Sequence, residues 1–312
     1  MIPRAEPYRF GDGASIGVGG LPHRDPDAGA AFAIGEFDIA TIPSLPQLSS
    51  FEGIVEQATE SLDGEGFEGL RTFMDLSQKV NLDGAPVKWQ FVGPVTLGIE
   101  LARTGVDTAT AFRQATTIVR SKLDEISELV TSALPNSPQL VVLDEPWFSD
   151  LMSPGFAIPP DEAVDILSSA MAALPTSTVV GVHCCAPCDI AMLLASGPSV
   201  ISVPVSADLV EWAGYITRFL DDGGIVAWGV IPTDGPIPTS ADRNWRALSD
   251  VWCSLVQLGC DPILLRQQSL VSPACGLSAH SVAIARRIAR LTSDVGRRVK
   301  DQSAATRLSL GA

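Results

Sequence analysis

Short runs of apolar residues, rich in β-branched and aromatic side chains, alternate along the chain with longer segments of helical periodicity. Several of the runs are apolar throughout, as strands covered on both faces must be. This alternation is typical of repeated βα units that build a parallel sheet. Eight runs are predicted to be strands: 15–22, 37–44, 87–94, 140–146, 178–184, 200–206, 225–232 and 261–270.

The segments between these runs show helical spacing and helix-end signals. Residues 108–134 repeat apolar positions every three or four residues, which predicts one long amphipathic helix. Proline and acidic residues open another helix near Pro160, and glycine ends two more. The further predicted helices cover about 209–220 with Asp208 as its cap, 241–258 and 281–300, and the irregular region 45–86 leaves room for an excursion of extra helices.

Eight strands with interleaved helices in about 310 residues predict an α/β fold, a (β/α)8 barrel that forms a single domain over residues 1–312. A doubly wound dinucleotide-binding sheet is the competing architecture. It would place a GxGxxG turn between an early strand and a helix. The nearest match, Gly17-Val18-Gly19-Gly20, lacks the third glycine and leads into proline, which disfavours that alternative.

Composition narrows the functions that such a barrel can serve. The chain has 21 Lys and Arg against 36 Asp and Glu, a net charge of -15, which argues against nucleic acid and anionic membranes as partners. No apolar run reaches the roughly 18 to 20 residues of a membrane helix, and the first residues lack the apolar stretch of a secretory signal. We therefore expect a cytoplasmic protein that acts on small molecules.

In a (β/α)8 barrel the chemistry lies at the carboxyl ends of the strands, and a histidine and cysteines follow two of the predicted strands. His183 and Cys185 are two residues apart at the end of the fifth strand, so their side chains can point to one place. A loop after the eighth strand can bring Cys275 to the same place. One imidazole and two thiolates suit Zn²⁺, and three protein ligands leave a fourth position open for catalysis.

The remaining cysteines have less specific interpretations. We expect Cys253, Cys260 and Cys184 to pack in the core, where free cysteines behave as small hydrophobic residues. Cys185 and Cys188 also form a CxxC pattern before a helix that can begin at Asp189, which leaves a redox function open. Cys188 is in addition an alternative metal ligand.

Adjacent carboxylates, Asp144 and Glu145, close the fourth predicted strand and are the candidate catalytic residues. Side chains of consecutive strand residues point in opposite directions, so one of the two can face the barrel mouth. A carboxylate there could bind an ammonium group or a metal-bound water. A salt bridge to an arginine of a loop is the structural alternative.

The motifs GGLPHRD, QFVGPVTLG, VVLDEPW, GVHCC, ISV, WGVI and SPACGL occur in the order, and at about the spacing, of the catalytic barrel of cobalamin-independent methionine synthases. From about residue 15 to 290 the chain thus resembles this family, which is related to uroporphyrinogen decarboxylase and to corrinoid-dependent methyltransferases. The resemblance implies a zinc-dependent methyltransferase that methylates a thiol. The first substrate it implies is homocysteine, whose methylation gives methionine. The methyl donor would be a methylated corrinoid protein or methyltetrahydrofolate.

The resemblance also assigns roles to individual residues. His183, Cys185 and Cys275 would bind zinc, and Asp144 would bind the amino group of homocysteine. Backbone N–H groups around Gly19 and Gly20 would hold the substrate carboxylate. The full set of expected substrate-binding residues is Gly19, Gly20, His23, Asp144 and Trp147.

The sequence departs from this family in three places. Pro204 follows the sixth strand where the synthases carry a glutamate ligand, although corrinoid-dependent relatives use only HxC and a later cysteine. Glycine stands where the synthases have a serine after strand one. The length fits one catalytic barrel without the additional barrel that helps the long synthases bind folate.

Two rival functions remain at this stage. A metal-free decarboxylase of the uroporphyrinogen type would need an arginine-rich mouth, for which Arg24 and Arg266 are the obvious candidates. A non-catalytic zinc- or thiol-binding paralogue is the second rival. The last predicted helix carries five arginines, which indicates either a solvated basic face or a docking surface for an acidic protein; the arginines are Arg286, Arg287, Arg290, Arg297 and Arg298.

Overall fold

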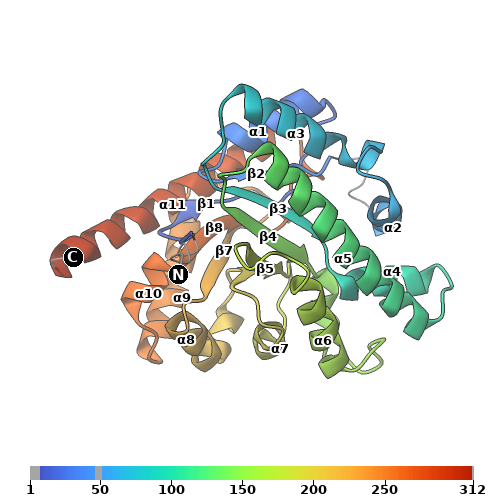
Figure 1. Cartoon of the computed structure of the whole chain (residues 1–312). Helices are drawn as coiled ribbons and strands as arrows, with labels where there is room; N and C mark the ends of the chain where they lie inside the picture. The colour runs from blue at the N-terminus through green and yellow to red at the C-terminus, as the bar shows by residue number, and fades with distance from the viewer. Residues whose placement is uncertain (1–7, 46–50, 311–312) are drawn as a thin grey trace, which may run out of the picture.

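Eight parallel strands curl into a barrel-like sheet surrounded by helices in the computed structural model, which describes residues 8–45 and 51–310 (Figure 1). The strands follow one another around the sheet in the order β1-β8-β7-β6-β5-β4-β3-β2. They are β1 (Ala14–Ser15), β2 (Ala40–Thr41), β3 (Val87–Val92), β4 (Gln139–Asp144), β5 (Val179–His183), β6 (Val200–Pro204), β7 (Ile225–Ile231) and β8 (Ser269–Pro273). The predicted α/β class and (β/α)8 architecture are thereby confirmed.

The two end strands, β1 and β2, close the sheet through isolated parallel bridges rather than a continuous ladder. Ile16 pairs with Ile39, and Gly20 pairs with Ser44. The N–H of Ser44 donates to the carbonyl of Gly19 over 2.7 Å. This second bridge lies at the carboxyl end of the barrel, so it draws the loop after β1 toward the loop after β2.

Apolar side chains fill both sides of the barrel wall. Inside, Leu140 and Val142 of β4 share a cluster with Val200 of β6, Ala227 of β7 and Leu270 of β8. Outside, the alternate residues of the same strands pack under the helices in a much larger cluster. Strands buried on both faces explain why the strand segments of the sequence are nearly continuous apolar runs.

Aspartate side chains cap the N-termini of four of the described helices, α1, α5, α7 and α10. Asp107 accepts a hydrogen bond from the N–H of Thr110 and so caps α5, whose buried stripe includes Phe112 and Leu123. The helices are α1 (Pro26–Gly35), α2 (Phe51–Thr59), α3 (Glu68–Lys79), α4 (Pro94–Arg103), α5 (Thr108–Ala133), α6 (Pro160–Met171), α7 (Ile190–Ala195), α8 (Ala213–Asp221), α9 (Asp242–Gln257), α10 (Pro262–Gln267) and α11 (Val282–Leu310). Short 3-10 helices are η2 (Glu65–Phe67), η3 (Pro146–Asp150) and η4 (Ala207–Trp212).

The prediction of a strand over 261–270 was wrong. Residues Pro262–Gln267 form α10, and β8 begins only at Ser269. The apolar run resembles a strand, but Asp261 accepts a hydrogen bond from the N–H of Ile263 and proline occupies the first helical turn. The shift has a functional consequence, because it places Cys275 two residues beyond the end of β8 and moves Arg266 to the opposite end of the barrel.

Another segment differs in detail from the prediction, whereas the helical excursion expected in 45–86 is present. The helix expected over 209–220 begins as the 3-10 helix η4 and becomes α-helical only at Ala213; Ser206, not Asp208, occupies the cap position of η4. In the region 45–86, the described residues form α2, η2 and α3. No helix of the described residues is both long and apolar enough to cross a membrane.

Ion pairs partly neutralise the arginines of α11, which runs outward from the barrel beside β1 and β8 (Figure 1). Arg286 contacts Glu36 at 2.8 Å, Arg298 contacts Asp242 at 2.6 Å, and Arg297 pairs with Asp294. The interpretation of α11 as a docking surface for an acidic protein stays a prediction. Because three of its arginines are in ion pairs, the helix carries less unpaired positive charge than the sequence alone indicates.

Candidate functional site

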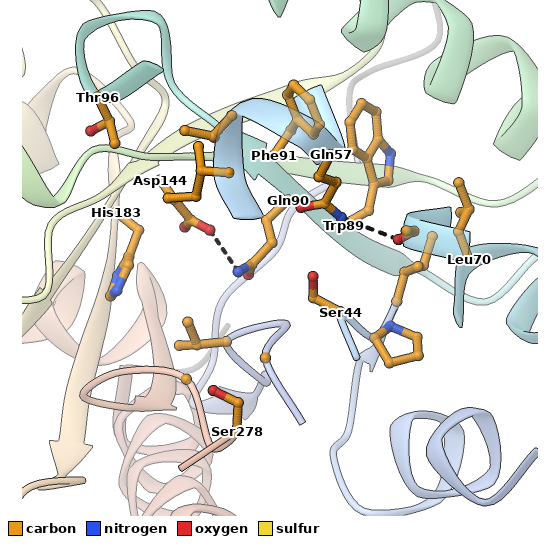
Figure 2. A pocket seen from close by; sticks show the side chains of 18 of the residues that line it. Ser44, Gln57, Leu70, Trp89, Gln90, Phe91, Thr96, Asp144, His183 and Ser278 are labelled. Carbon is orange, nitrogen blue, oxygen red and sulfur yellow. Dashed lines mark hydrogen bonds between the residues drawn. The ribbon is translucent and has the colours of Figure 1, made fainter. Parts of the chain in front are cut away.

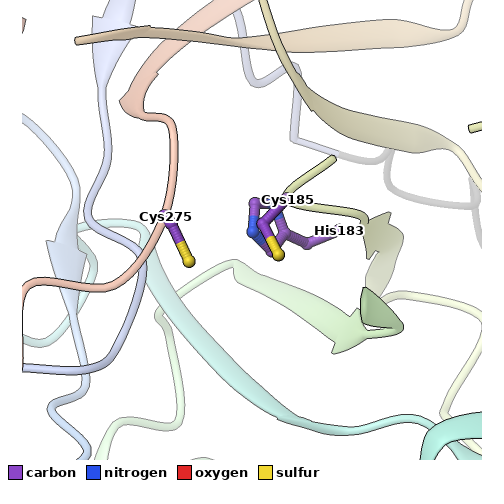
Figure 3. Close-up of side chains that lie close together, drawn as sticks. All are labelled: His183, Cys185 and Cys275. Atoms are coloured by element: carbon purple, nitrogen blue, oxygen red, sulfur yellow. The ribbon is translucent and has the colours of Figure 1, made fainter. Parts of the chain in front are cut away.

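His183, Cys185 and Cys275 lie together at the carboxyl end of the barrel (Figure 3). His183 ends β5, Cys185 follows two residues later, and Cys275 lies in the loop after β8. One ring nitrogen of the histidine and the two Sγ atoms are all within 4.8 Å of one another. The three residues predicted from the HxC spacing and the late cysteine are thus close enough to share one metal ion.

The His183 ring is held so that one nitrogen faces the two thiols. Nδ1 shares a hydrogen bond of 3.0 Å with Oγ of Ser202, a residue of the neighbouring strand β6. Nε2 is buried and has no hydrogen-bond partner within the described residues. Leaving a buried ring nitrogen unpartnered is costly unless a ligand satisfies it, and a second hydrogen bond that fixes the ring is the usual support of a metal-binding histidine. The donor set is therefore one that could hold a metal ion.

The two cysteines of the group interact with each other. A hydrogen bond from Cys275 lowers the pKa of Cys185, and the same contact raises the pKa of Cys275, with burial acting in the same direction. Cys185 therefore loses its proton more readily than Cys275, and a positive charge between the two would favour the thiolate form of both. A bound metal ion would supply that charge.

A glycine on β7 lets the loop that carries Cys275 approach the barrel mouth. A Cβ atom at Gly229 would lie 2.9 Å from Cα of Ala274 and 3.1 Å from Cα of Pro204. Both contacts are to backbone atoms and cannot yield cheaply. Pro204, the last residue of β6, thus belongs to a tightly packed wall next to the loop that carries Cys275.

The other cysteines do not join the metal group. Cys184 is fully buried, interacts with Cys188, and lies 3.5 Å from the carbonyl oxygen of Ala186. Cys260 is buried against Oγ1 of Thr217 at 2.8 Å, as expected of a core cysteine. The prediction that Cys253 packs in the core was wrong, because the buried stripe of α9 falls on other positions and leaves Cys253 exposed.

The contacts of Cys185 and Cys188 disfavour the alternative that the CxxC pattern has a redox function. Cys185 interacts with Cys275 and Cys188 interacts with Cys184, so the two cysteines of the motif are each paired elsewhere. The helix expected there exists: Asp189 accepts from the N–H of Met192 at 3.0 Å and caps α7.

Asp144, at the end of β4, is anchored through one oxygen and leaves the other without a partner. Oδ2 accepts a 2.7 Å hydrogen bond from Nε2 of Gln90 on β3, while the buried Oδ1 has no partner among the described residues (Figure 2). Burial raises the pKa of Asp144, against the opposing effects of Lys88 and of the Gln90 hydrogen bond. A carboxylate oxygen in this position is ready to bind a cationic or proton-donating group.

Gln90 and Lys88 are site residues that the sequence reasoning missed. Oε1 of Gln90 accepts hydrogen bonds from the N–H of Gly19, at 2.9 Å, and from Nζ of Lys88. Lys88 is only 2% exposed, and this burial lowers its pKa. The signal was present: the strand VKWQFV places polar residues at alternate positions, on the face of β3 opposite Trp89 and Phe91.

Glu145 turns away from the pocket and ties β4 to the start of α4. Its carboxylate accepts from the N–H of Val95 at 2.9 Å, the N–H of Thr96 at 2.7 Å and Oγ1 of Thr96 at 2.6 Å. Burial raises the pKa of Glu145 to about 7 in spite of these three donors. The adjacent carboxylates therefore do point in opposite directions. The catalytic role predicted for Glu145 stays a prediction, while its contacts are those of a helix cap.

A pocket of about 340 Å³ opens at His183, Cys185 and Cys275 and continues away from them between β3 and the helices α2 and α3 (Figure 2). Polar residues surround one end and apolar residues surround the other. The lining residues at the polar end include Gly20, Gln90, Asp144, His183, Cys185, Cys275, Gly276 and Ser278.

The remaining predicted substrate-binding residues are spread over different places. Gly20 lines the pocket, whereas the Gly19 N–H donates to Gln90. His23 is buried against the Phe32 ring at a centroid distance of 4.9 Å and borders a separate surface groove. Nε1 of Trp147 donates to Glu100 at 2.9 Å, and its ring lies under Arg103. Neither His23 nor Trp147 lines the pocket of the structure.

No protein-family model and no curated protein matches the chain. Among solved structures, a Listeria monocytogenes protein provisionally named as a vitamin-B12-independent methionine synthase shares 14% identity with a TM-score of 0.45, over 84% of this chain and 72% of that one. A cube-shaped designed protein cage shares 13% identity with a TM-score of 0.36, over 95% of this chain and 80% of the cage chain. At these identities and TM-scores, neither likeness assigns a family to the chain.

Fold and site together define a (β/α)8-barrel protein with a histidine and two cysteines grouped at the carboxyl end of the barrel. That group could hold a metal ion. A pocket beside it is large enough for a small organic ligand.

Proposed function

We propose that the protein is a zinc-dependent methyltransferase whose acceptor is a small thiol. The observation that carries the proposal is the group of His183, Cys185 and Cys275 lining the same pocket as the half-anchored carboxylate of Asp144. The order of the sequence motifs supports thiol methylation in particular, with homocysteine as the first acceptor to test. A methylated corrinoid protein or methyltetrahydrofolate would be the donor.

The chemistry requires a thiolate at neutral pH. A free alkyl thiol has a pKa near 8.5 and is mostly protonated at neutral pH, and only the thiolate attacks an electrophilic methyl group. Zinc bound by His183, Cys185 and Cys275 would lower the pKa of a substrate thiol at its remaining position. Two cysteine ligands would keep that sulfur electron-rich.

The residues of the chain supply orientation. Oδ1 of Asp144 has no partner among the residues that the structure describes and could accept a hydrogen bond from a substrate ammonium group, while Gln90 holds the other carboxylate oxygen in place. Ser202 fixes the ring of His183. A sulfur, a methyl group and a leaving atom held in line by such fixed contacts react far faster than free reactants.

The decarboxylase alternative fits the pocket poorly. A substrate with several carboxylates needs cationic side chains around it, and none of the described residues that line the pocket is arginine or lysine. Arg24 borders a separate surface groove, and Arg266 lies on α10 before β8. We therefore place methyl transfer ahead of decarboxylation.

Transfer of a methyl group to homocysteine tests the proposal. The zinc-loaded protein is incubated with homocysteine and either methylcobalamin or methyltetrahydrofolate, and methionine is measured; Cys185→Ser is the inactive variant and Cys253→Ser, on the exposed face of α9, is the matched control. Methionine formation by the wild type and the control, but not by Cys185→Ser, supports the proposal. If the wild type binds zinc yet forms no methyl thioether with any thiol or donor, the protein is a zinc-binding paralogue instead.

A further inference from the structure

The pocket continues well beyond the group of metal-ligating residues, into a region that we call the apolar arm. It is lined by Ile42 and Pro43 after β2, Ile54 of α2, Phe67 of η2, Leu70 of α3, Trp89, Phe91 and Val92 of β3, and Ile126 of α5. Figure 2 shows Trp89, Phe91 and Leu70 on the side of the pocket away from His183. The arm therefore extends one ligand site from the barrel mouth to the space under the helical excursion.

Two polar side-chain groups next to the arm already donate hydrogen bonds within the protein. Nε1 of Trp89 donates to Oε1 of Gln139 at 2.8 Å, and Nε2 of Gln57 donates to the carbonyl of Gly66 at 3.2 Å. Trp89 is 1% exposed and Phe91 5%. The arm thus offers a ligand carbon surfaces and few hydrogen-bonding groups, which favours an apolar occupant.

The charged residues that line the pocket do not match the ammonium and carboxylate groups of an amino acid. Asp144 is the only acidic residue among the described lining residues, and Lys and Arg are absent from them. An ammonium group could bind Asp144, but the carboxylate of an amino acid would find no cation, and the Gly19 N–H already donates to Gln90. Lys88 is buried with its ammonium group on Gln90.

We infer that the thiol substrate carries an uncharged apolar body, an alkyl or aryl group, which lies in the apolar arm while its sulfur lies beside His183, Cys185 and Cys275. This inference rests on the proposed function and narrows its substrate class. Homocysteine has no apolar group beyond its two methylenes and leaves the arm empty.

A chain-length series measures the arm directly, without relying on turnover. Isothermal titration of the zinc-loaded protein with propanethiol, butanethiol, pentanethiol and hexanethiol should give affinities that rise about fourfold for each methylene until the arm is full. Homocysteine should bind more weakly than hexanethiol. Affinity that does not change with chain length, or homocysteine binding more tightly than hexanethiol, would overturn the inference.

Two variants of α2 tie the effect to the arm. Ile54 lines the pocket, whereas Val55, also half-buried on the same helix, does not. Ile54→Asn should weaken hexanethiol binding about tenfold or more, because the alkyl chain of the ligand would lie against a polar amide instead of the apolar side chain of isoleucine. Val55→Asn should bind like the wild type. Equal losses in both variants would mean that the helix itself, not the arm, was disturbed, and would count against the inference.

The metal-free protein separates this inference from the proposed function. Hexanol has the same apolar body without a thiol, and its binding should still fall in Ile54→Asn. If hexanol shows this dependence while the protein binds no zinc, the apolar arm stands and the methyltransferase proposal fails. If zinc binds and homocysteine is methylated while alkanethiols show no chain-length dependence, the proposed function stands and the apolar substrate is refuted.

Discussion

Replacing Gly19 by alanine tests whether Gln90 positions Asp144 in the way the contacts indicate. A Cβ atom at Gly19 would lie 2.7 Å from Cδ and 2.9 Å from Nε2 of Gln90, closer than side chains pack. Gly20 is the matched control, because a Cβ there would lie no closer than 3.6 Å to any neighbour. The two variants make the same chemical change at adjacent residues.

We expect Gly19→Ala to lose stability mainly because it breaks hydrogen bonds of Gln90, not only because the new Cβ atom overlaps the Gln90 side chain. A glutamine side chain can rotate away, but Gln90 bridges the half-buried carboxylate of Asp144, whose Oδ1 is fully buried, and the ammonium group of the buried Lys88. Hydrogen bonds to charged groups contribute about 1.5–3 kcal/mol each. We expect Gly19→Ala to lower the free energy of unfolding by about 2–4 kcal/mol relative to Gly20→Ala. The entropic gain of replacing glycine is similar in both and cancels from the comparison.

Denaturant unfolding at pH 7, with thermal unfolding as a second probe, measures this difference. The melting temperature of Gly19→Ala should fall about 3–6 °C below that of Gly20→Ala. Zinc content should be unchanged in both variants, because neither glycine belongs to the metal group. A difference in stability smaller than about 0.5 kcal/mol, the usual effect of a neutral surface substitution, would refute the proposed bridge.

Two other substitutions probe the contacts around the metal group and α4. Ser202→Ala removes the hydrogen bond to Nδ1 of His183 and should weaken zinc binding about 10- to 100-fold in a chelator competition, with the fold retained by circular dichroism; unchanged affinity would show that the ring is held by other contacts. Glu145→Gln should change how stability depends on pH. Burial raises the pKa of Glu145 in the folded protein to about 7, above its ordinary value of 4.5, so this carboxyl stabilises the wild type below pH 4.5 and loses that contribution, about 3 kcal/mol, as the pH rises to 7. The unfolding free energy of the wild type minus that of Glu145→Gln, measured at pH 5 and pH 8, should be smaller at pH 8, and equal values would contradict the assignment.

Most of the barrel could be predicted because buried parallel strands leave continuous apolar runs and long helices leave a periodic stripe. The segment 261–270 was misassigned for a physical reason. Its apolar run suits either a strand or a short helix, and the cap at Asp261 followed by Pro262 decides for the helix. Cys253 shows a similar limit, because a cysteine among apolar helix neighbours can still fall on the exposed face.

The metal group could be predicted from spacing along two strands, since alternation fixes the direction of His183 and Cys185. The supports of the site could not. Gln90 reaches Asp144 only because β3 lies beside β4 in register, with Val92 opposite Asp144. The helix cap formed by Glu145 also joins residues 49 and 50 positions apart. Such contacts depend on strand order and rotamers, which no local pattern contains.

The metal content of the purified protein tests the central claim most directly. The wild type, expressed with zinc and dialysed, should contain stoichiometric zinc by elemental analysis, and Cys275→Ser should lose it. Cys188→Ser should keep it, because Cys188 interacts with Cys184 and lies outside the group of three. A metal-free wild type, or a Cys275→Ser variant that retains full zinc, would contradict the assignment of His183, Cys185 and Cys275 as a zinc site.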